Sequence, residues 1–303
     1  MDHDGRRRID PQGVPETLLW NLHQRAYEAR QPHPVLDDPK AIELVERVDR
    51  PCEETFGPPS RLLSQGQALR VRTFDDAVRA FLREHPRGTV VTLAEGVETQ
   101  FWRVDNGRAH WLCVELPETA KVRRALLPDG ERRRTPARSA LALSWRDEVD
   151  ASHGVLVTAQ GLLMYLRPAE VRQLIAGCAE AFPGGALVFD AVPRWFGERT
   201  LRGEMKTARG YVTPPMPWAL DAGELPKIRT AHPAVTRGAR TAAATRTRRV
   251  LRRGLARAAA AAGGAQHPAD HGRPGPVRPD RRTAPRTPSA ARPLRTVKQR
   301  ARR

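Results

Sequence analysis

The sequence has few cysteines and no long apolar run. Its three cysteines are Cys52, Cys113 and Cys178, and no two of them form a CxxC pair. That spacing argues against a disulfide framework and against a structural zinc site, so reduced thiols are the simplest interpretation. No apolar run reaches the length of about eighteen residues that a membrane span needs, and no apolar signal core follows the basic residues 1–8. We therefore expect a soluble, cytoplasmic protein without bound metal or membrane contact.

Familiar catalytic motifs are also missing. The chain has no G-x-S-x-G nucleophile elbow, no H-E-x-x-H pair and no G-x-x-x-x-G-K-[ST] loop. These absences argue against a serine hydrolase, a zinc protease and a P-loop enzyme. The histidines at positions 23, 85, 110 and 153 are scattered, and we interpret them as structural or solvated.

Aromatic residues are absent from the last part of the chain, where the positive charge gathers. All 16 aromatics lie at or before Trp218. Residues 237–303 contain 19 Lys+Arg and 2 Asp+Glu, which leaves 33 basic and 32 acidic residues for positions 1–236. The formal net charge of +18 therefore belongs to the tail, whereas the body is nearly neutral and, with 40% apolar residues in the whole chain, can bury a core.

The tail at 237–303 is rich in Arg, Ala and Pro, and we expect it to be disordered apart from a short helix near 250–262. One hypothesis is a shift of reading frame near Thr236, because a GC-rich coding sequence read out of frame yields this composition. The other is a basic arm that binds nucleic acid by counterion release. The lack of aromatic stacking groups favours the first hypothesis. Translating the DNA in its other two frames would decide between them.

Helical periodicity marks the first part of the body. Helices are predicted after Pro15 and after Asp38. The clearest helix carries apolar residues at 71, 74, 78, 81 and 82, a period close to 3.6. We expect these helices to form an N-terminal cap over residues 1–85.

From residue 86 to 236 strand-like runs alternate with helical segments, the pattern of a parallel sheet. Strands are predicted at 89–94, 111–116, 135–141, 155–159 and 186–191, with a helix beginning at Pro168 before the last of them. The expected fold class is α/β, a doubly wound Rossmann-like sheet whose site lies at the carboxyl ends of its strands.

The turn after the first predicted strand is the first candidate site. A dinucleotide fingerprint G-x-G-x-x-G would place glycines where this chain has Ala94, Gly96 and Thr99. Two of the three glycines are missing, and Glu95 and Glu98 disfavour phosphate. S-adenosylmethionine, a sulfonium cation without phosphate, suits such a loop better. The alternative is an ordinary strand-to-helix turn that contains a glycine.

A carboxylate at the end of the second predicted strand strengthens the first interpretation. Glu115 lies 19 residues after Gly96, close to the spacing of about 20 at which an acid accepts ribose hydroxyls in dinucleotide-binding folds. The alternative is a solvent-exposed glutamate at a strand end. Together the two features favour a nucleoside-type cofactor.

Three segments taken as a set resemble a known family. Residues 93–103 (LAEGVETQFWR), 114–118 (VELPE) and 160–166 (QGLLMYL) are similar to the leucine carboxyl methyltransferase family, and most similar to its bacterial branch of tetracenomycin-type polyketide carboxyl O-methyltransferases. The resemblance covers roughly residues 14–228. It implies a class I S-adenosylmethionine-dependent methyltransferase that acts on the carboxylate of a small, polyketide-like acid.

The resemblance also implies roles for individual residues. Arg70, with Arg72 in reserve, would grip the carboxylate of the methionine moiety. Glu115 would bind the ribose, and Gln160 would face the methionine part. The other implied cofactor residues are Ala94, Glu95, Gly96, Leu116, Leu141 and Ala142. Many family members have an acid where Ala142 stands and Glu where Gln160 stands.

The aromatic residues Trp20, Trp102 and Tyr165 are candidates for the acceptor pocket, although an aromatic residue in such a position is more often part of the core. No catalytic residue is expected, because a carboxylate is already ionised near neutral pH and needs only alignment and desolvation. The N-terminal helices would close over the cofactor.

A sheet of this class normally ends in an antiparallel hairpin. Only residues 231–236 suggest one of its strands, and no candidate is apparent for the final strand. The alternative function is therefore that of a non-catalytic methyltransferase-like protein whose tail binds nucleic acid. We expect nucleic acid as a partner of the tail only, and not of the body. The sequence does not identify the acceptor or the oligomeric state.

Overall fold

A computed structural model describes residues 16–48, 53–54, 57–206, 212–240 and 295–301, all within one compact unit of the chain. The α-helices are α1 (Glu16–Ala29), α2 (Pro39–Arg47), α4 (Arg61–Glu84), α5 (Gln100–Val104), α6 (Pro117–Leu126), α7 (Pro168–Ala181) and α8 (Arg194–Leu201). Short 3-10 helices cover Ala140–Ala142, Ser144–Glu148, Leu163–Tyr165 and Ala222–Ala231. None of the helices in the described ranges is long and apolar enough to cross a membrane.

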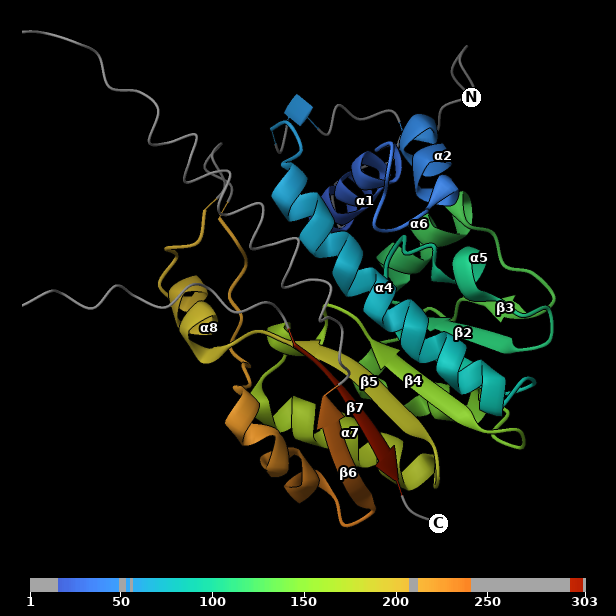
Figure 1. Cartoon of the computed structure of the whole chain (residues 1–303). Helices are drawn as coiled ribbons and strands as arrows, with labels where there is room; N and C mark the ends of the chain where they lie inside the picture. Colours follow the sequence, from blue (N-terminus) through green and yellow to red (C-terminus); the bar gives the residue numbers. More distant parts are fainter. Residues whose placement is uncertain (1–15, 49–52, 55–56, 207–211, 241–294, 302–303) are drawn as a thin grey trace, which may run out of the picture. The chain divides into compact units, whose positions relative to one another are not determined.

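The strands form one mixed sheet (Figure 1). They are β1 (Thr89–Leu93), β2 (His110–Val114), β3 (Arg133–Arg134), β4 (Val155–Ala159), β5 (Ala186–Ala191), β6 (Val235–Arg240) and β7 (Arg295–Ala301). Their order across the sheet is β3-β2-β1-β4-β5-β7-β6. The first five pair in parallel, whereas β7 runs antiparallel to both β5 and β6. The order reverses between β1 and β4, which is the switch point of a doubly wound sheet.

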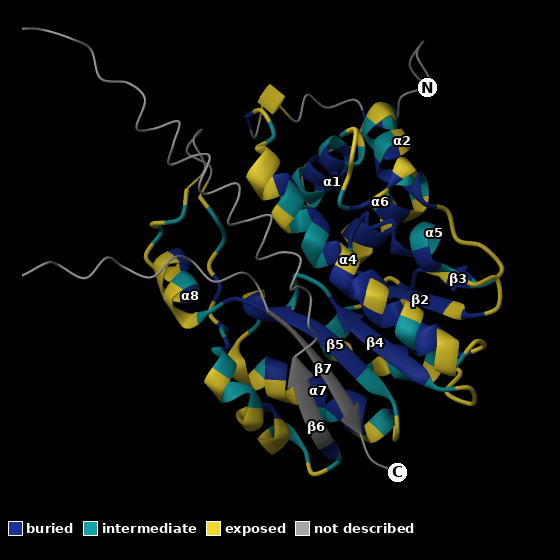
Figure 2. Ribbon diagram, in the orientation of Figure 1, coloured by how far each residue is buried: buried dark blue, intermediate teal, exposed yellow. Residues whose placement is uncertain are grey.

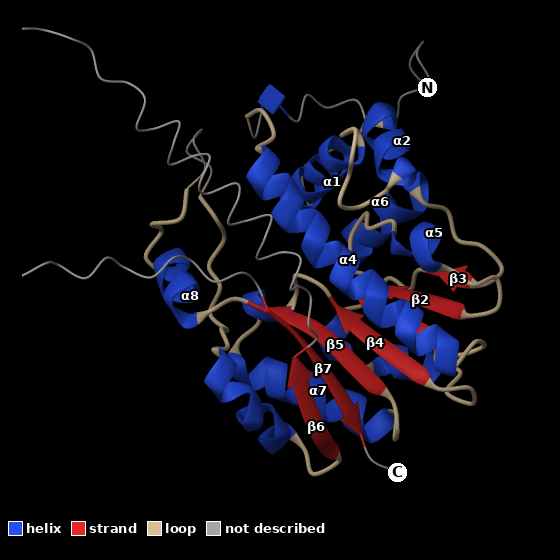
Figure 3. Cartoon of the chain, in the orientation of Figure 1, coloured by secondary structure: helices blue, strands red, loops and turns tan. Residues whose placement is uncertain are grey.

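The central strands are buried on both faces, so they consist of nearly continuous apolar runs (Figure 2). Alternate residues serve opposite faces. Val90 and Leu156 pack with Phe74 of α4 on one face, whereas Val91 and Val157 belong to the cluster that contains the α7 stripe on the other. Figure 3 shows α4 and α7 on these two sides of the sheet. The α4 helix, expected in the N-terminal cap, thus also forms part of the layer that covers the sheet.

Local sequence explains where the helices begin. Asp38 caps α2 by accepting a hydrogen bond from the amide of Ala41 at 3.0 Å, and Pro39 occupies the first turn. Pro117 and Pro168 likewise occupy the first turns of α6 and α7. Helices α1, α2 and α6 bury a shared apolar cluster that includes Leu19, Leu22, Leu44 and Leu126.

Three sequence predictions are corrected. The predicted strand at 135–141 is wrong: β3 is Arg133–Arg134, just before it, and Leu141 lies in a 3-10 helix. Pro136 has no amide hydrogen, and the Ser139 side chain caps the 3-10 helix, so that only an isolated bridge between Glu115 and Ala137 extends the pairing.

The prediction that the final strand is missing is also wrong, since Arg295–Ala301 forms β7 between β5 and β6. The boundary at Thr236 falls inside β6, so the expectation of a tail without regular structure fails for 237–240 and 295–301. The helix predicted near 250–262 lies outside the described residues.

Candidate cofactor-binding site

The turn after β1 has an unusual backbone. Ala94 and Gly96 both adopt positive φ angles, of 51° and 63°. Such angles cost little at glycine and more at alanine. A Cβ built on Gly96 would lie 2.6 Å from the Cδ1 of Leu18, so α1 presses directly on this turn. The chain therefore requires glycine at position 96 for two separate reasons.

Glu115 lies against the same turn. Its Oε1 accepts a hydrogen bond of 2.7 Å from the amide of Gly96, and the residue is 3% exposed. Burial raises the pKa of Glu115 to about 7, although the Arg123 guanidinium works in the opposite direction. The predicted ribose acid and the predicted glycine are thus in direct contact.

Arg123 of α6, which was not predicted from the sequence, contacts the backbone of the turn after β1. It is fully buried, donates to the carbonyl oxygens of Gly96 and Glu98, and pairs with Oε1 of Glu95 at 2.5 Å. Burial raises the pKa of Glu95, and the charge of Arg123 counteracts that rise. The available signal was its place in the buried stripe of α6, three residues after Ala120 and three before Leu126.

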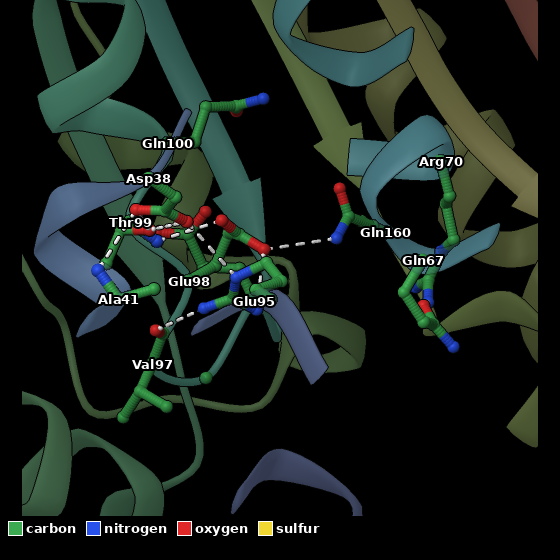
Figure 4. Close-up of polar contacts among 12 residues, drawn as sticks. Asp38, Ala41, Gln67, Arg70, Glu95, Val97, Glu98, Thr99, Gln100 and Gln160 are labelled. Carbon is green, nitrogen blue, oxygen red and sulfur yellow. Dashed lines mark hydrogen bonds and ion pairs between the residues drawn. The ribbon is translucent and has the colours of Figure 1, made fainter. Parts of the chain in front are cut away.

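Glu98 connects the turn to β4. Its Oε2 accepts a hydrogen bond of 3.3 Å from Nε2 of Gln160 (Figure 4). Its two oxygens also pair with Arg25 at 3.0 Å and Arg103 at 2.8 Å. Burial alone would raise the pKa of Glu98, but the two guanidinium groups outweigh it and hold the pKa at about 2. Glu98 is therefore ionised, and it orients the amide of Gln160.

Arg25 and Arg103 also connect the helices α1, α2, α4 and α5 to the turn after β1. Arg103 of α5 pairs with Asp38 at 2.7 Å and with Asp75 of α4 at 2.8 Å. Arg25 of α1 lies 3.4 Å from Asp38, and the hydroxyl of Thr99 donates to Asp38 at 2.7 Å. We call Arg25, Arg103, Asp38, Asp75 and Glu98 the buried ion cluster.

Arg70 of α4 approaches the ends of β4 and β5. Its Nε pairs with Oδ2 of Asp190 at 2.7 Å, and its Nη1 donates to Oε1 of Gln67 at 2.9 Å. A Cβ on Gly161 would collide with its Nη2. In Figure 4 Gln160 lies between Arg70 and the Glu98 group. Arg72, the reserve candidate, instead points to the carbonyl of Val35 at 3.4 Å.

The remaining predicted residues are spread more widely. Leu116 is 53% exposed at the start of α6, and the 3-10 helix after β3 holds Leu141, half-buried, and Ala142, exposed. Tyr165 follows β4 in a 3-10 helix and is 38% exposed.

The structure gives the two predicted tryptophans a packing role. Trp20 and Trp102 lie against the cluster of α1, α2 and α6, and the Trp102 ring also lies 4.2 Å from the guanidinium of Arg133. Only Tyr165 of the three aromatics lies at the carboxyl edge of the parallel strands, beside the Gln160 turn.

A cavity of about 480 Å³ lies at the opposite edge of the sheet. Its lining includes His85, Arg87 and His153, all of which precede a strand. In doubly wound folds ligands bind at the carboxyl ends of the strands, so this cavity is not the expected cofactor site.

The sign of the buried charge tests which cofactor fits the carboxyl edge. Six carboxylates and four guanidinium groups gather there, most of them buried, and they are Asp38, Asp75, Glu95, Glu98, Glu115, Asp190, Arg25, Arg70, Arg103 and Arg123. With Glu115 ionised the group is net negative. Such a field repels a pyrophosphate and favours a ligand that carries sulfonium and ammonium charges.

A family model now decides the assignment. The model described as "Leucine carboxyl methyltransferase" matches residues 19–179, more than half of the chain. The chain belongs to the leucine carboxyl methyltransferase family. The resemblance predicted from the sequence is confirmed, and the protein is an S-adenosyl-L-methionine-dependent methyltransferase with a Rossmann-like fold.

Curated relatives agree with this family. The chain is 34% identical over 189 residues to the tetracenomycin polyketide synthesis O-methyltransferase TcmP of Streptomyces glaucescens, covering 60% of this chain and 67% of the relative. It is 30% identical over 199 residues to the S-adenosyl-L-methionine-dependent methyltransferase dpfgK of Gibberella zeae, covering 59% and 66%. The matched regions thus span about two thirds of both relatives.

Solved structures similar to this chain include a putative methyltransferase from Thermobifida fusca, with 14% identity, a TM-score of 0.48 and coverage of 96% and 99% of the two chains. Magnesium protoporphyrin IX methyltransferase from Synechocystis, solved with bound SAH, matches with 12% identity, a TM-score of 0.41 and coverage of 80% and 89%.

Proposed function

We propose that the protein transfers a methyl group from S-adenosyl-L-methionine to the carboxylate of a small organic acid. When bound, this cofactor supplies a methyl group made electrophilic by its sulfonium. The residues assigned to hold it are Glu115 at the ribose, Gly96 at the close backbone approach and Arg70 at the methionine carboxylate. Gln160, oriented by Glu98, lies between the last two.

The observation that carries the proposal is which partners the buried acids at the carboxyl edge of the sheet have. Glu95 pairs with Arg123, Glu98 with two arginines, and Asp190 with Arg70. Glu115 is hydrogen-bonded to Gly96 and assigned to the ribose. Glu95, Glu98 and Asp190 are thus paired with arginines and Glu115 is assigned to the ribose, so we assign none of these acids as a general base.

Histidines do not supply a base at this edge either. Of the six described histidines, His85, His110 and His153 lie at the amino ends of the strands, and His23 is buried in α1. His33 is exposed between α1 and α2, and His232 lies between the last 3-10 helix and β6. An acceptor that must lose a proton, such as a phenol, would need a base, whereas a carboxylate arrives ionised. The reaction then depends on alignment and exclusion of water.

The relative TcmP, named as a polyketide synthesis O-methyltransferase, supports an acid of polyketide type as the acceptor. Tyr165, exposed beside the Gln160 turn, is the residue we assign to the acceptor side. An aromatic ring there suits a planar, apolar acceptor.

Product chemistry tests the proposal. The full chain is incubated with methyl-labelled S-adenosyl-L-methionine and with matched pairs of aromatic compounds that bear a carboxylate, or a hydroxyl in its place. We expect label in the acids only, and release of labelled methanol when the product is treated with alkali, because esters hydrolyse there and phenol ethers do not. Alkali-stable label in the hydroxyl compounds would contradict a carboxylate acceptor.

A further inference from the structure

We propose that Asp190 is a positioning residue that holds the guanidinium of Arg70 in place for the carboxylate of the methionine moiety. The proposal rests on the cofactor role assigned to Arg70 above. Asp190 touches neither the assigned ribose site nor the acceptor side, and besides Arg70 it contacts the amide of Gly161. The variant described below keeps an acceptor for that amide, so that its effect passes through Arg70.

Asp190 joins two elements that the chain brings together from far apart. It lies near the end of β5, and because Ala159 pairs with Phe189 in parallel register, it neighbours the turn that follows β4. It is 1% exposed. Its Oδ1 accepts a hydrogen bond of 2.7 Å from the amide of Gly161, and its Oδ2 pairs with Nε of Arg70 at 2.7 Å. One carboxylate therefore fixes α4 and the β4 turn relative to each other.

The guanidinium of Arg70 has contacts on more than one side. Gln67, one turn earlier on α4, accepts from Nη1 at 2.9 Å, and Nη2 lies over Gly161 where a Cβ would collide. Gly161 has a φ of 71°, which also favours glycine. The contact with Asp190 is an ion pair without hydrogen-bond geometry, so the bond to Gln67 is the one hydrogen bond that Arg70 donates among the described residues, and the guanidinium retains N–H donors for a ligand.

Two physical effects of Asp190 on a ligand carboxylate oppose each other. Its negative charge partly cancels the charge of Arg70, which would weaken binding. Its contact fixes the long side chain before the ligand arrives, so that rotamer freedom is not lost on binding. The buried geometry, with contacts on several sides of Arg70, indicates that positioning outweighs cancellation.

The variant Asp190→Asn separates these effects. The amide oxygen can still accept from Gly161, whereas the amide nitrogen cannot accept from Nε of Arg70. Binding is measured by calorimetry on the full chain with two ligands, S-adenosylhomocysteine and its decarboxylated analogue. We expect the variant to weaken S-adenosylhomocysteine about tenfold and to change the analogue less than about twofold.

Control variants keep the test decisive. Asp75→Asn alters a carboxylate that is as buried and also paired with an arginine, and we expect it to affect both ligands equally. In an Arg70→Met background, Asp190→Asn should not change the ratio of the two affinities further. Gln67→Ala should also weaken the binding of S-adenosylhomocysteine relative to that of its decarboxylated analogue. This variant replaces Asp190→Asn if Asp190→Asn does not fold.

Three results would overturn the proposal: an equal loss for both ligands, a gain for S-adenosylhomocysteine, or an effect that persists in the Arg70→Met background. A wild-type chain that binds neither ligand would instead refute the cofactor assignment itself. A wild-type chain that binds both equally would refute the role of Arg70.

Discussion

At the scale of single residues, Glu115 differs from Glu98 in its protonation. Glu98, with two guanidinium partners, has a pKa of about 2, whereas burial raises that of Glu115 to about 7. Glu115, which we assign to the ribose, is therefore partly protonated near neutral pH in the unliganded protein. Hydroxyl groups donate to a carboxylate, so binding of the nucleoside should favour the ionised form.

The pKa of Glu115 predicts a pH dependence of stability. Between its ordinary value of 4.5 and about 7, the folded state holds a proton that the unfolded state has released. Stability of the unliganded protein should therefore fall as the pH rises through this window, by at most ~3 kcal/mol. Urea unfolding of the wild type and of Glu115→Gln at about pH 5 and about pH 8 measures it. A stability difference between the two proteins that is the same at both pH values would contradict the raised pKa.

Two glycines with positive φ provide a matched test of the turn after β1. Gly107 has a φ of 76° and nothing within 4 Å of its Cβ position, so Gly107→Ala should cost only the backbone term of about 1 kcal/mol. Gly96→Ala adds the clash with Leu18, and we expect it to cost about 1–3 kcal/mol more and to weaken S-adenosylhomocysteine binding. Equal costs for the two variants would show that the fold around Leu18 adapts freely.

At the scale of the elements, the buried ion cluster joins α1, α2, α4 and α5 around the turn. Arg103 alone contacts all three of its acids. Replacing buried ion pairs by apolar groups is often tolerated, but removing one partner leaves charge without compensation.

That asymmetry predicts a large effect for Arg103→Gln. Asp38 and Glu98 would then share Arg25, Asp75 would keep the Gln100 amide but lose its guanidinium partner, and we expect a loss of about 3–5 kcal/mol in the free energy of unfolding. Arg47→Gln removes an exposed pair with Glu43 on α2 and should cost less than about 0.5 kcal/mol. Urea titrations compare the two, and similar losses would mean that the cluster adds little to stability.

Elements whose pattern is local were predictable from the sequence. The strands β1, β4 and β5 are continuous apolar runs, and α4 has clear periodicity, so their places were predicted to within a few residues apart from the start of α4. The segment at 135–141 was misread because Pro136 interrupts a run with strand-like composition. Gly96 and Glu115 were found because their spacing reflects one βαβ unit.

The partners that complete the site were not predictable in the same way. Asp190 and Arg70 are far apart in the chain, and nothing local to either indicates that they meet. The spacing of Arg123 from Ala120 and Leu126 indicates a buried position, but its partners in the turn after β1 become apparent only from the packing of α6. Long-range pairing of charged groups depends on the finished fold.

At the scale of the whole molecule, the sheet depends on a strand from the basic tail. β7 pairs with β5 over six residues and with β6 on its other side. Since β6 contacts the rest of the sheet through β7, the two strands form one unit. The hypothesis of a shifted reading frame remains a prediction, to be tested on the DNA.

Truncation tests the role of this strand. Removal of residues 295–303 deletes β7, exposes the edge of β5 and leaves β6 without a neighbour in the sheet. We expect a clear loss of thermal stability, by several degrees, and a tendency to aggregate through the open edge. Removal of 302–303 alone is the control and should change the melting temperature little. An unchanged melting temperature after the longer truncation would show that β7 adds nothing to the sheet.

The position of β7 between β5 and β6 has a consequence for synthesis on the ribosome. β6 leaves the exit tunnel well before its neighbour does, because residues 241–294 are made in between. Until residues 241–294 have been translated, the nascent chain can form its parallel strands, but β6 has no strand to pair with. Translation, at about 5–20 residues per second, is slower than most folding steps, so the last pairing in the sheet should follow the order of translation rather than the order of the strands in space.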